Sequence, residues 1–423
     1  MSTRNINYLS SMLIIGALFF TFGFVTWLNS ILIPFFKKAC ELSDQQAYYV
    51  ATAFFAAYFI MAIPSSYILK YLGTKKGMVV GLGIMSLACF LFIPAANSRS
   101  YVGFLSALFL MGTGLTLLQT ASNPYVSVIG PIESAANRIS IMGICNKLAG
   151  IIGSIFIGGI LLKNADAIDE TLKVTTDLTA KTAILNDLVS RVIVPYSIMG
   201  VVFLVISYLI YISSLKDISE QLTEEEDTKL SMSKTSIFQF RHVWFGALAI
   251  FMYVAAEVMA GDLIGVYGKK LGFDTDATKY FTSFGLIGLL IGYLLSIVII
   301  PKYIKQEVWL SICSILGIIL AIASYFATPY MAIFFLASLG FANAVMWPAI
   351  FPLGIKELGR FTNIGSGLLI MGIVGGAVVP PFYGWLYEKA NIGLDFRSAF
   401  LVLMVACYAY IFWFGKVGHK TEA

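Results

Sequence analysis

Long apolar stretches recur along almost the whole chain, separated by short polar connections. A helix rises 1.5 Å per residue, so about 20 apolar residues are needed to cross a hydrocarbon core about 30 Å thick. Most of the stretches reach that length and carry almost no charge between their ends. We therefore predict an all-α membrane protein whose twelve transmembrane helices lie at 12–36, 46–70, 77–97, 101–128, 139–162, 192–213, 243–267, 280–301, 308–327, 330–354, 364–387 and 396–414.

The composition agrees with a membrane protein. Charged residues make up 12% of the chain, about half the share in an average soluble protein. The net charge of +5 does not indicate nucleic-acid binding, because the basic residues lie between the spans. We expect membrane lipid as the surrounding partner, no nucleic acid, and a monomer.

Residues suited to metal binding or catalysis do not cluster in the sequence. The five cysteines are scattered without a Cys-x-x-Cys pair, and both histidines, His242 and His419, lie at or beyond span ends. Neither an HExxH nor a GxSxG motif occurs. The sequence therefore predicts no metal site, no catalytic residues, no cofactor and no enzymatic activity.

A polar linker divides the predicted spans into six plus six. It runs from Leu215 to Phe240 and contains the acidic run Glu224–Asp227 with almost no aromatic residues, which is typical of solvated chain. We predict an N-terminal six-helix bundle at 1–214, a cytoplasmic linker at 215–240 and a C-terminal six-helix bundle at 241–423. A second long connection, Asn164–Ser190, is also expected to be polar loop.

The distribution of Lys and Arg predicts the orientation. Basic residues are more frequent on the side that holds both termini, and such an excess marks the cytoplasmic side. An even number of spans also places both termini on one side. We expect a multi-pass protein of a bacterial inner membrane with cytoplasmic termini.

The two halves contain a weak internal repeat. The segment Gln119–Pro124 in the fourth span resembles Asn343–Pro348 in the tenth, and Gly143 corresponds to Gly367 at the same offset. Parallel repeats of this kind build one large class of transporter, whose substrate site lies at the repeat interface near the membrane midplane.

Three charged residues lie inside predicted spans: Lys147 in the fifth, and Glu257 and Asp262 in the seventh. A charge inside the bilayer costs about 2.5–3.5 kcal/mol on insertion scales, so it has a partner or a function. Lys147 and Glu257 either form a structural ion pair, or Glu257 binds the coupling cation while Lys147 controls its ionisation. Asp262 lies further outward, where gating and cation binding are equally suitable roles.

Several motifs resemble the fucose–galactose–glucose/proton symporter family of the major facilitator superfamily. They are Phe22–Pro34 in the first span, Gln119–Tyr125 followed by Gly130-Pro131, and Gly365–Leu369 with Gly375-Gly376. The resemblance implies two pseudo-symmetric six-helix bundles, a central cavity, alternating access and a monosaccharide substrate, a hexose or amino-hexose, imported with a cation. The family favours H⁺ as the coupling ion, with Na⁺ as the alternative.

The chain departs from the fucose–proton symporter pattern at two positions. Ser30 and Gln119 occupy positions at which that pattern has an aspartate and a glutamate. Neither side chain titrates at physiological pH, so the proton site of the family does not carry over to these residues. A sugar uniporter, or a transporter of a non-sugar polar solute, therefore stays open as an alternative.

Side-chain amides match sugar hydroxyls because both can donate and accept hydrogen bonds. The alternative role of such amides is to hold helices together. Among aromatic residues, Trp347 beside Pro348 is the strongest candidate to stack on a sugar ring; Trp27 and Tyr253 are further candidates. The predicted sugar-binding residues are Asn29, Gln119, Asn123, Asn146, Asn343 and Trp347.

Overall fold

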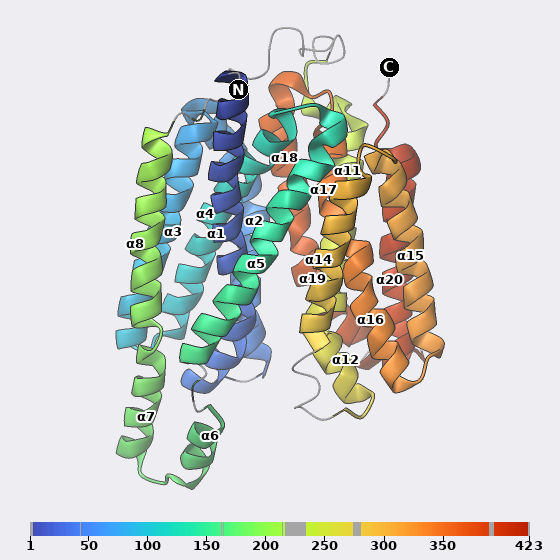
Figure 1. Ribbon diagram of the computed structural model, residues 1–423. Coiled ribbons are helices and arrows are strands. Elements are labelled where there is room, and N and C mark those ends of the chain that lie inside the picture. The colour runs from blue at the N-terminus through green and yellow to red at the C-terminus, as the bar shows by residue number, and fades with distance from the viewer. Residues whose placement is uncertain are drawn as a thin grey trace. The chain divides into compact units, whose positions relative to one another are not determined.

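The structure is a computed structural model that describes residues 3–42, 44–161, 163, 165–213, 215, 234–273, 281–388 and 393–421. In these ranges, 12 helices are long and apolar enough to cross a membrane (Figure 1). The prediction of an all-α membrane protein with twelve spans is therefore confirmed. Most of the predicted linker, residues 216–233, lies outside the described ranges, as do the side chains of Asn29 and Ser30.

The chain forms two compact units. Unit 1 comprises Met1–Met61, Thr74–Gln119 and Cys145–Leu215, and unit 2 comprises Ala62–Gly73, Thr120–Ile144 and Lys216–Ala423. Unit 2 thus contains one end of each of three helices from the N-terminal half, together with the C-terminal half. The division of the sequence into bundles at 1–214 and 241–423 remains a prediction.

The helices of the N-terminal half are mostly long and continuous. They are α1 (Thr3–Ala39), α2 (Asp44–Leu72), α3 (Thr74–Asn97), α4 (Tyr101–Val128), the 3₁₀ turn η1 (Ile132–Ser134), α5 (Ala135–Leu161), α6 (Ala165–Val174), α7 (Leu178–Ser190) and α8 (Ile193–Ile212).

Side-chain hydroxyls connect α3 to α8 inside unit 1. Ser86 Oγ donates to the carbonyl of Gly200 at 2.7 Å, and Ser207 Oγ donates to that of Val79 at 3.0 Å. In a bilayer, where water does not compete, such bonds add about 1 kcal/mol to helix association.

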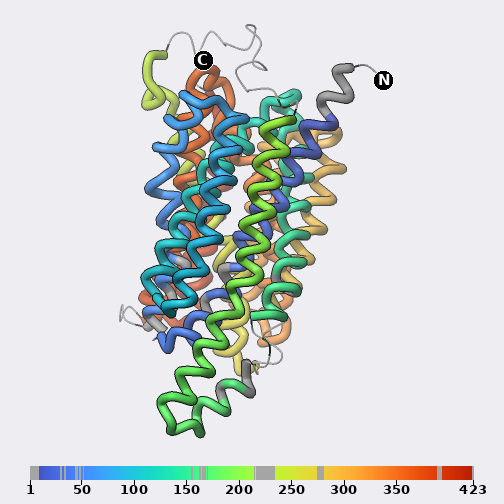
Figure 2. The backbone as a smooth tube through the Cα atoms, turned by 90° about the vertical axis from the view of Figure 1, so that its left-hand side faces the viewer, coloured from blue at the N-terminus to red at the C-terminus, as the bar shows by residue number. Residues whose placement is uncertain are grey.

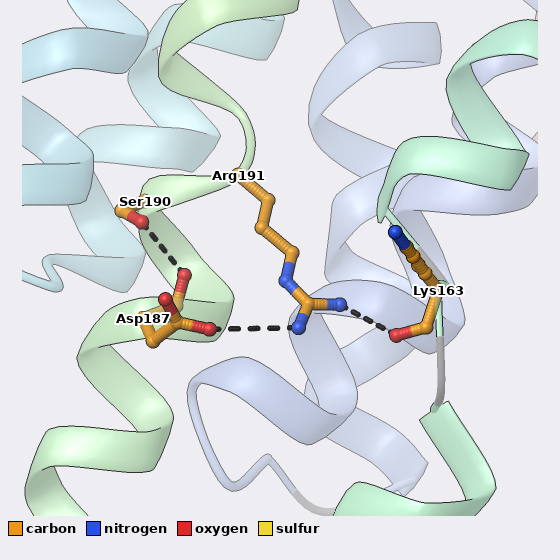
Figure 3. Close-up of polar contacts among 4 residues, drawn as sticks. All are labelled: Lys163, Asp187, Ser190 and Arg191. Carbon is orange, nitrogen blue, oxygen red and sulfur yellow. Dashed lines mark hydrogen bonds and ion pairs between the residues drawn. The ribbon is translucent and has the colours of Figure 1, made fainter.

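Within the connection expected to be loop, residues 165–174 and 178–190 form the helices α6 and α7, which differs from the sequence prediction. Asp177 begins α7, because its carboxylate accepts hydrogen bonds from the backbone N–H groups of Thr179 and Ala180. At the other end, Arg191 donates to the carbonyl of Lys163 at 2.6 Å and reaches Asp187 at 3.5 Å (Figure 3). Figure 2 shows α6 and α7 at the end of unit 1 away from the N-terminus of α1.

A buried arginine closes the end of α4. Arg138 is 4% exposed and lies on the first turns of α5. Its guanidinium donates to the carbonyls of Val126, Ser127, Gly130 and Pro131 at 2.7–3.1 Å. Val126 and Ser127 lie in the last turn of α4, where carbonyls have no partner within the helix, so Arg138 satisfies a helix end that would otherwise lack these hydrogen bonds.

The C-terminal half contains shorter helices. They are η3 (Ile237–Gln239), α11 (Arg241–Gly261), α12 (Ile264–Lys270), α14 (Phe281–Ile299), α15 (Gln306–Phe326), α16 (Pro329–Asn343), α17 (Met346–Ile355), η4 (Gly359–Phe361), α18 (Thr362–Met371), η5 (Gly372–Val374), α19 (Gly375–Glu388), α20 (Phe396–Trp413) and the π turn η6 (Phe414–Gly418).

Three predicted spans of this half are interrupted. The seventh breaks between α11 and α12 at Asp262-Leu263, the tenth between α16 and α17 at Ala344-Val345, and the eleventh narrows to the 3₁₀ turn η5. Pro348 explains the second break, since it has no N–H to bond the carbonyl of Ala344 four residues earlier. Interruptions of this kind leave backbone polar groups available inside a membrane protein.

Candidate functional site

Gln119 forms a hydrogen bond with a buried tyrosine in unit 1. Its Nε2 donates to the hydroxyl oxygen of Tyr58 at 3.1 Å, and Tyr58 also contacts Thr26 through a side-chain hydrogen bond. Tyr58 is 1% exposed, whereas Gln119 is only half-buried. The bond therefore orients the Gln119 side chain through its Nε2 atom, and Oε1 does not take part in the contact with Tyr58.

Lys147 lies over the indole of Trp27 in unit 1. The Nζ atom is 4.9 Å from the ring centroid, and the lysine is 8% exposed. Gly150 permits this approach, because a Cβ there would overlap the Trp27 ring. A desolvated cation–π contact of this kind contributes on the order of 2 kcal/mol.

Asn146, the neighbour of Lys147, links α5 to α1. Its Nδ2 donates to the carbonyl of Phe19 at 3.4 Å, which is a long hydrogen bond. Gly23 of α1 lies directly against the Asn146 backbone, where a side chain would overlap it. The placement is compatible with both roles predicted for this amide, helix packing and sugar contact.

Asn123 and Trp347 form a polar contact in unit 2. The indole Nε1 of Trp347 donates to Oδ1 of Asn123 at 3.3 Å. The Trp347 ring lies 5.8 Å from that of Phe351 in a stacked arrangement and 6.3 Å from that of Tyr253. Asn123 is 1% exposed but Trp347 is only partly buried, so the amide holds in place an indole that a ligand can reach.

Glu257 contacts one buried tyrosine of unit 2 and influences two others electrostatically. Tyr253, four residues earlier on the same face of α11, is in side-chain hydrogen-bonding contact with it. Tyr293 and Tyr408 lie within electrostatic range of the same carboxyl group. Glu257 itself is half-buried. Tyrosine hydroxyls can donate to a carboxylate and accept from a carboxylic acid, so this setting suits both protonation states.

Asn343 is paired in a way that resembles Gln119. Its Oδ1 accepts a hydrogen bond of 2.9 Å from the hydroxyl of Tyr408, and the amide is 1% exposed. Gln119 and Asn343 are aligned by the sequence repeat, and each forms a hydrogen bond with a tyrosine hydroxyl. Asn343 ends α16 beside the break at Ala344.

Asp262 lies apart from Glu257, at the break between α11 and α12. It is exposed, and its backbone N–H bonds the carbonyl of Val258 at 2.8 Å. Glu257 and Asp262 are therefore in different environments. The predicted pairing of Lys147 with Glu257 joins residues of different units and remains a prediction, as do the roles of all the predicted site residues.

Unit 2 also contains hydrogen bonds between the two sequence halves. Asn137 Nδ2 donates to the carbonyls of Ile297 and Ile300 at 2.8 and 3.0 Å. Ser366 Oγ donates to the carbonyl of Thr120 at 3.0 Å. Gly367 packs so closely on Ser66 that a Cβ would overlap its hydroxyl. These contacts tie the ends of α2, α4 and α5 to the C-terminal half.

The sequence analysis did not identify three residues of these clusters: Tyr58, Tyr293 and Tyr408. Only Tyr253 carried a usable signal, since its spacing of four residues from Glu257 predicts a shared helix face. The other tyrosines reach their partners from distant segments. Among the described residues, no group of three or more His, Cys, Asp or Glu side chains could hold a metal ion.

Comparison with known proteins decides the family. Residues 14–372 match the model of the Major Facilitator Superfamily. The chain belongs to this superfamily. It is therefore a multi-pass membrane transporter with the major facilitator fold, as the sequence motifs indicate.

Individual relatives refine the comparison. The chain is 34% identical to a glucose/galactose transporter of Brucella abortus biovar 1 (strain 9-941) over 425 residues, which cover 98% of this chain and 95% of the relative. It is 29% identical to the L-fucose-proton symporter of Escherichia coli (strain K12), over 98% of this chain and 94% of that protein. The crystal structure of FucP in the outward conformation superposes with a TM-score of 0.84 at 28% identity, covering 98% of this chain and 100% of that one. The resemblance to the fucose–galactose–glucose symporter family is thereby confirmed.

Proposed function

We propose that this chain imports a monosaccharide, a hexose or amino-hexose, by cation symport with alternating access. The observation that carries the proposal is the 34% identity with a glucose/galactose transporter along almost the whole chain. The amides and aromatic residues placed in the spans suit a ligand rich in hydroxyls. Two six-helix bundles, 1–214 and 241–423, move about the linker at 215–240.

The coupling ion is H⁺, with Na⁺ as the alternative. A relative named as a proton symporter supports this choice. Ser30 and Gln119 do not titrate, so the proton needs another acceptor. Glu257 is the acceptor we propose, because it is half-buried and its tyrosine neighbours can accommodate both the charged and the neutral carboxyl group.

Lys147 and Asp262 have supporting roles in this mechanism. Lys147 controls the ionisation of Glu257 in one part of the transport cycle, and the Trp27 ring stabilises the lysine when the two are apart. Asp262, exposed at the helix break, serves as a gate or an outer cation site.

The sugar is bound by amides and one indole. Trp347 stacks on the apolar face of the pyranose, in an orientation fixed by Asn123. Gln119 and Asn146 are partly exposed and offer hydrogen bonds to hydroxyl groups. Asn343 is almost completely buried, and so is its partner Tyr408, so Asn343 contacts the sugar when the helix break at Ala344 opens. Asn29 belongs to the same proposed set.

We also propose that the protein is a monomer in a bacterial inner membrane, with both termini in the cytoplasm. The excess of Lys and Arg on the side of the termini supports this orientation.

Uptake by proteoliposomes tests the proposal. Labelled glucose, galactose, fucose, mannose and N-acetylglucosamine are offered singly, with an inward H⁺ gradient, an inward Na⁺ gradient or none. We expect at least one sugar to accumulate above its external concentration with the H⁺ gradient alone. Accumulation with the Na⁺ gradient alone would assign Na⁺ as the coupling ion. No uptake of any of these sugars would contradict sugar transport.

A uniporter is the second candidate, favoured by the loss of titratable groups at positions 30 and 119. It predicts sugar equilibration that neither gradient affects. Transport of a non-sugar polar solute is the remaining alternative.

A further inference from the structure

A pocket of about 350 Å³ lies beside the last turn of α2 in unit 2. Its walls come from both sequence halves: Lys70 belongs to α2, whereas Thr235, Arg360, Phe361, Asn363 and Ile364 belong to the segments around η3 and α18. The volume is at the lower end of the range for small-molecule sites. Gln119, Trp347 and Glu257 are not among the residues that line it.

The charged groups of this pocket are both cations. Lys70 and Arg360 are exposed, and no carboxylate within the described ranges forms an ion pair with either of them. The nearest carboxylate along the chain from Arg360, that of Glu357, instead approaches Lys356 at 3.8 Å. A pocket with two cations, neither of them paired with a carboxylate of the described ranges, attracts an anion.

Arg360 is held in position without using up its donors. One guanidinium nitrogen donates to the carbonyl of Lys234 at 3.0 Å, and the group lies 5.0 Å from the ring centroid of Phe361. A guanidinium has five N–H donors, so most remain for a ligand. Their planar fork matches the oxygens of a phosphate group, and a nearby lysine adds a point charge.

Asn363 adds a requirement for a hydrogen-bond donor. Its Oδ1 is buried and has no hydrogen-bond partner among the described residues. A buried acceptor without a hydrogen bond destabilises the protein. A ligand that donates a hydrogen bond to this oxygen therefore binds more tightly. Asn363 lines the pocket, so a turn of its side chain brings this oxygen to the pocket surface, where a hydroxyl group of the ligand can donate to it. The ligand therefore carries a hydroxyl group as well as anionic oxygens. Phe361 and Ile364 provide an apolar wall for the carbon atoms between them.

Lys70 ends an apolar span, which places the pocket at the level of lipid headgroups. Basic residues at this depth attract the anionic lipids of the membrane surface. We propose that the pocket binds a phosphate ester that carries a hydroxyl group. The phosphoglycerol group has this chemistry, and it occurs both in the headgroup of phosphatidylglycerol and in free glycerol phosphate.

Because the pocket lies between segments of both sequence halves, ligand binding there would affect transport. The ligand contacts α2 of the N-terminal half and α18 of the C-terminal half, close to where Gly367 packs on Ser66. A ligand that bridges both halves binds more tightly to a conformation in which α2 and α18 lie together than to one in which they are apart. It therefore stabilises the conformation that is closed at the pocket. The site would thus regulate the transporter without contacting its sugar.

A binding experiment on the purified full chain tests the site independently of transport. Thermal unfolding is followed in detergent while one of three probes is titrated: phosphatidylglycerol, phosphatidylcholine or glycerol 3-phosphate. We expect phosphatidylglycerol to stabilise the protein in a saturable manner and phosphatidylcholine to have no effect. An equal effect of glycerol 3-phosphate would support the site and assign it to a soluble ester; no effect of that ester would assign it to lipid.

Two double variants distinguish the pocket from general surface charge. Lys70→Gln/Arg360→Gln removes the two pocket cations, and Lys302→Gln/Lys416→Gln removes two exposed lysines that do not line it. We expect the first pair to weaken binding at least tenfold and the second pair to leave it unchanged. Equal weakening by both pairs, or unchanged binding in the first, would overturn the proposal.

Two single variants at Asn363 test the donor requirement. Asn363→Asp should abolish binding of phosphatidylglycerol, since it places a carboxylate beside the phosphate. Asn363→Leu removes the acceptor but leaves the cations, and it should weaken phosphatidylglycerol more than phosphatidate, whose headgroup lacks the hydroxyl. Equal weakening of the two lipids by Asn363→Leu would contradict the hydroxyl contact.

Discussion

The indole nitrogen of Trp347 donates a hydrogen bond to Oδ1 of Asn123 at 3.3 Å. The two residues lie in the repeat-related fourth and tenth spans, so this bond joins the two sequence halves where both carry a proline-containing motif. Asn123 is buried and Trp347 is partly exposed, which makes the indole the accessible member of the pair.

Replacing Trp347 should therefore weaken sugar binding. Trp347→Phe removes the N–H and part of the ring, and we expect the KM for the transported sugar to rise about tenfold, the equivalent of about 1.4 kcal/mol. Trp385→Phe, at an exposed tryptophan of α19, is the matched control and should leave KM unchanged. An unchanged KM in Trp347→Phe would exclude a sugar contact by this residue.

The tyrosine–amide pair of the C-terminal half predicts an effect on stability. Tyr408→Phe leaves Oδ1 of Asn343 buried without a donor, which costs about 1–3 kcal/mol. Tyr208→Phe, at an exposed tyrosine of α8, should change stability by less than about 0.5 kcal/mol. Thermal unfolding in detergent measures both. If Tyr408→Phe and Tyr208→Phe unfolded at the same temperature, the hydrogen bond from Tyr408 to Asn343 would contribute nothing to stability.

Two glycines at one helix contact predict opposite outcomes. A Cβ on Gly340 of α16 would overlap the carbonyl oxygen of Gly285 in α14, whereas a Cβ on Gly285 meets nothing within 4 Å. Gly340→Ala should therefore force the helices apart and destabilise the protein by about 1–3 kcal/mol. Gly285→Ala should be tolerated. The account of this contact fails if the two variants unfold at the same temperature.

Asp395 predicts a pH-dependent contribution to stability outside the membrane spans. It caps α20 by accepting from the backbone N–H of Ser398 at 2.8 Å, and its hydrogen bonds with Ser398 lower the pKa of its carboxyl group below 3.8. A lowered pKa means that the stabilisation is complete above the unfolded-state pKa and is lost as the pH falls through the folded-state pKa.

The corresponding variant is Asp395→Ala. Loss of the cap should cost about 1 kcal/mol at pH 7, with Asp395→Asn costing less because Asn also caps helices. The difference between wild type and Asp395→Ala should begin to shrink as the pH falls below about 4, where Asp395 of the unfolded chain becomes protonated, and should shrink further as the pH falls through the lower folded-state pKa. A difference that stays constant down to pH 3 would contradict a role for the charge.

The fold was largely predictable because hydrophobic length is a strong local signal. All twelve spans follow from it, and the motifs around Asn123 identify the family. The interruption at Ala344 also has a sequence cause in Pro348, yet the break at Asp262 has no such cause. The helices α6 and α7 were missed, since a polar composition predicts loop while the cap at Asp177 stabilises a helix.

The clusters around the site were less predictable because they depend on tertiary contacts. The sequence identified Gln119, Asn343 and Glu257 as polar groups inside spans, but their tyrosine partners come mostly from other helices. Nothing in the local sequence pairs Tyr58 with Gln119, which are 61 residues apart. Likewise, the pocket at Lys70 depends on segments from both halves of the chain.

The central claim is that protonation of Glu257 couples sugar import to the H⁺ gradient, and Glu257→Gln tests it most directly. Glutamine keeps the size and the hydrogen bond to Tyr253 but cannot release a proton. In proteoliposomes we predict that this variant loses accumulation of sugar driven by an inward H⁺ gradient while retaining exchange of labelled for unlabelled sugar. Accumulation equal to that of the wild type would contradict the account.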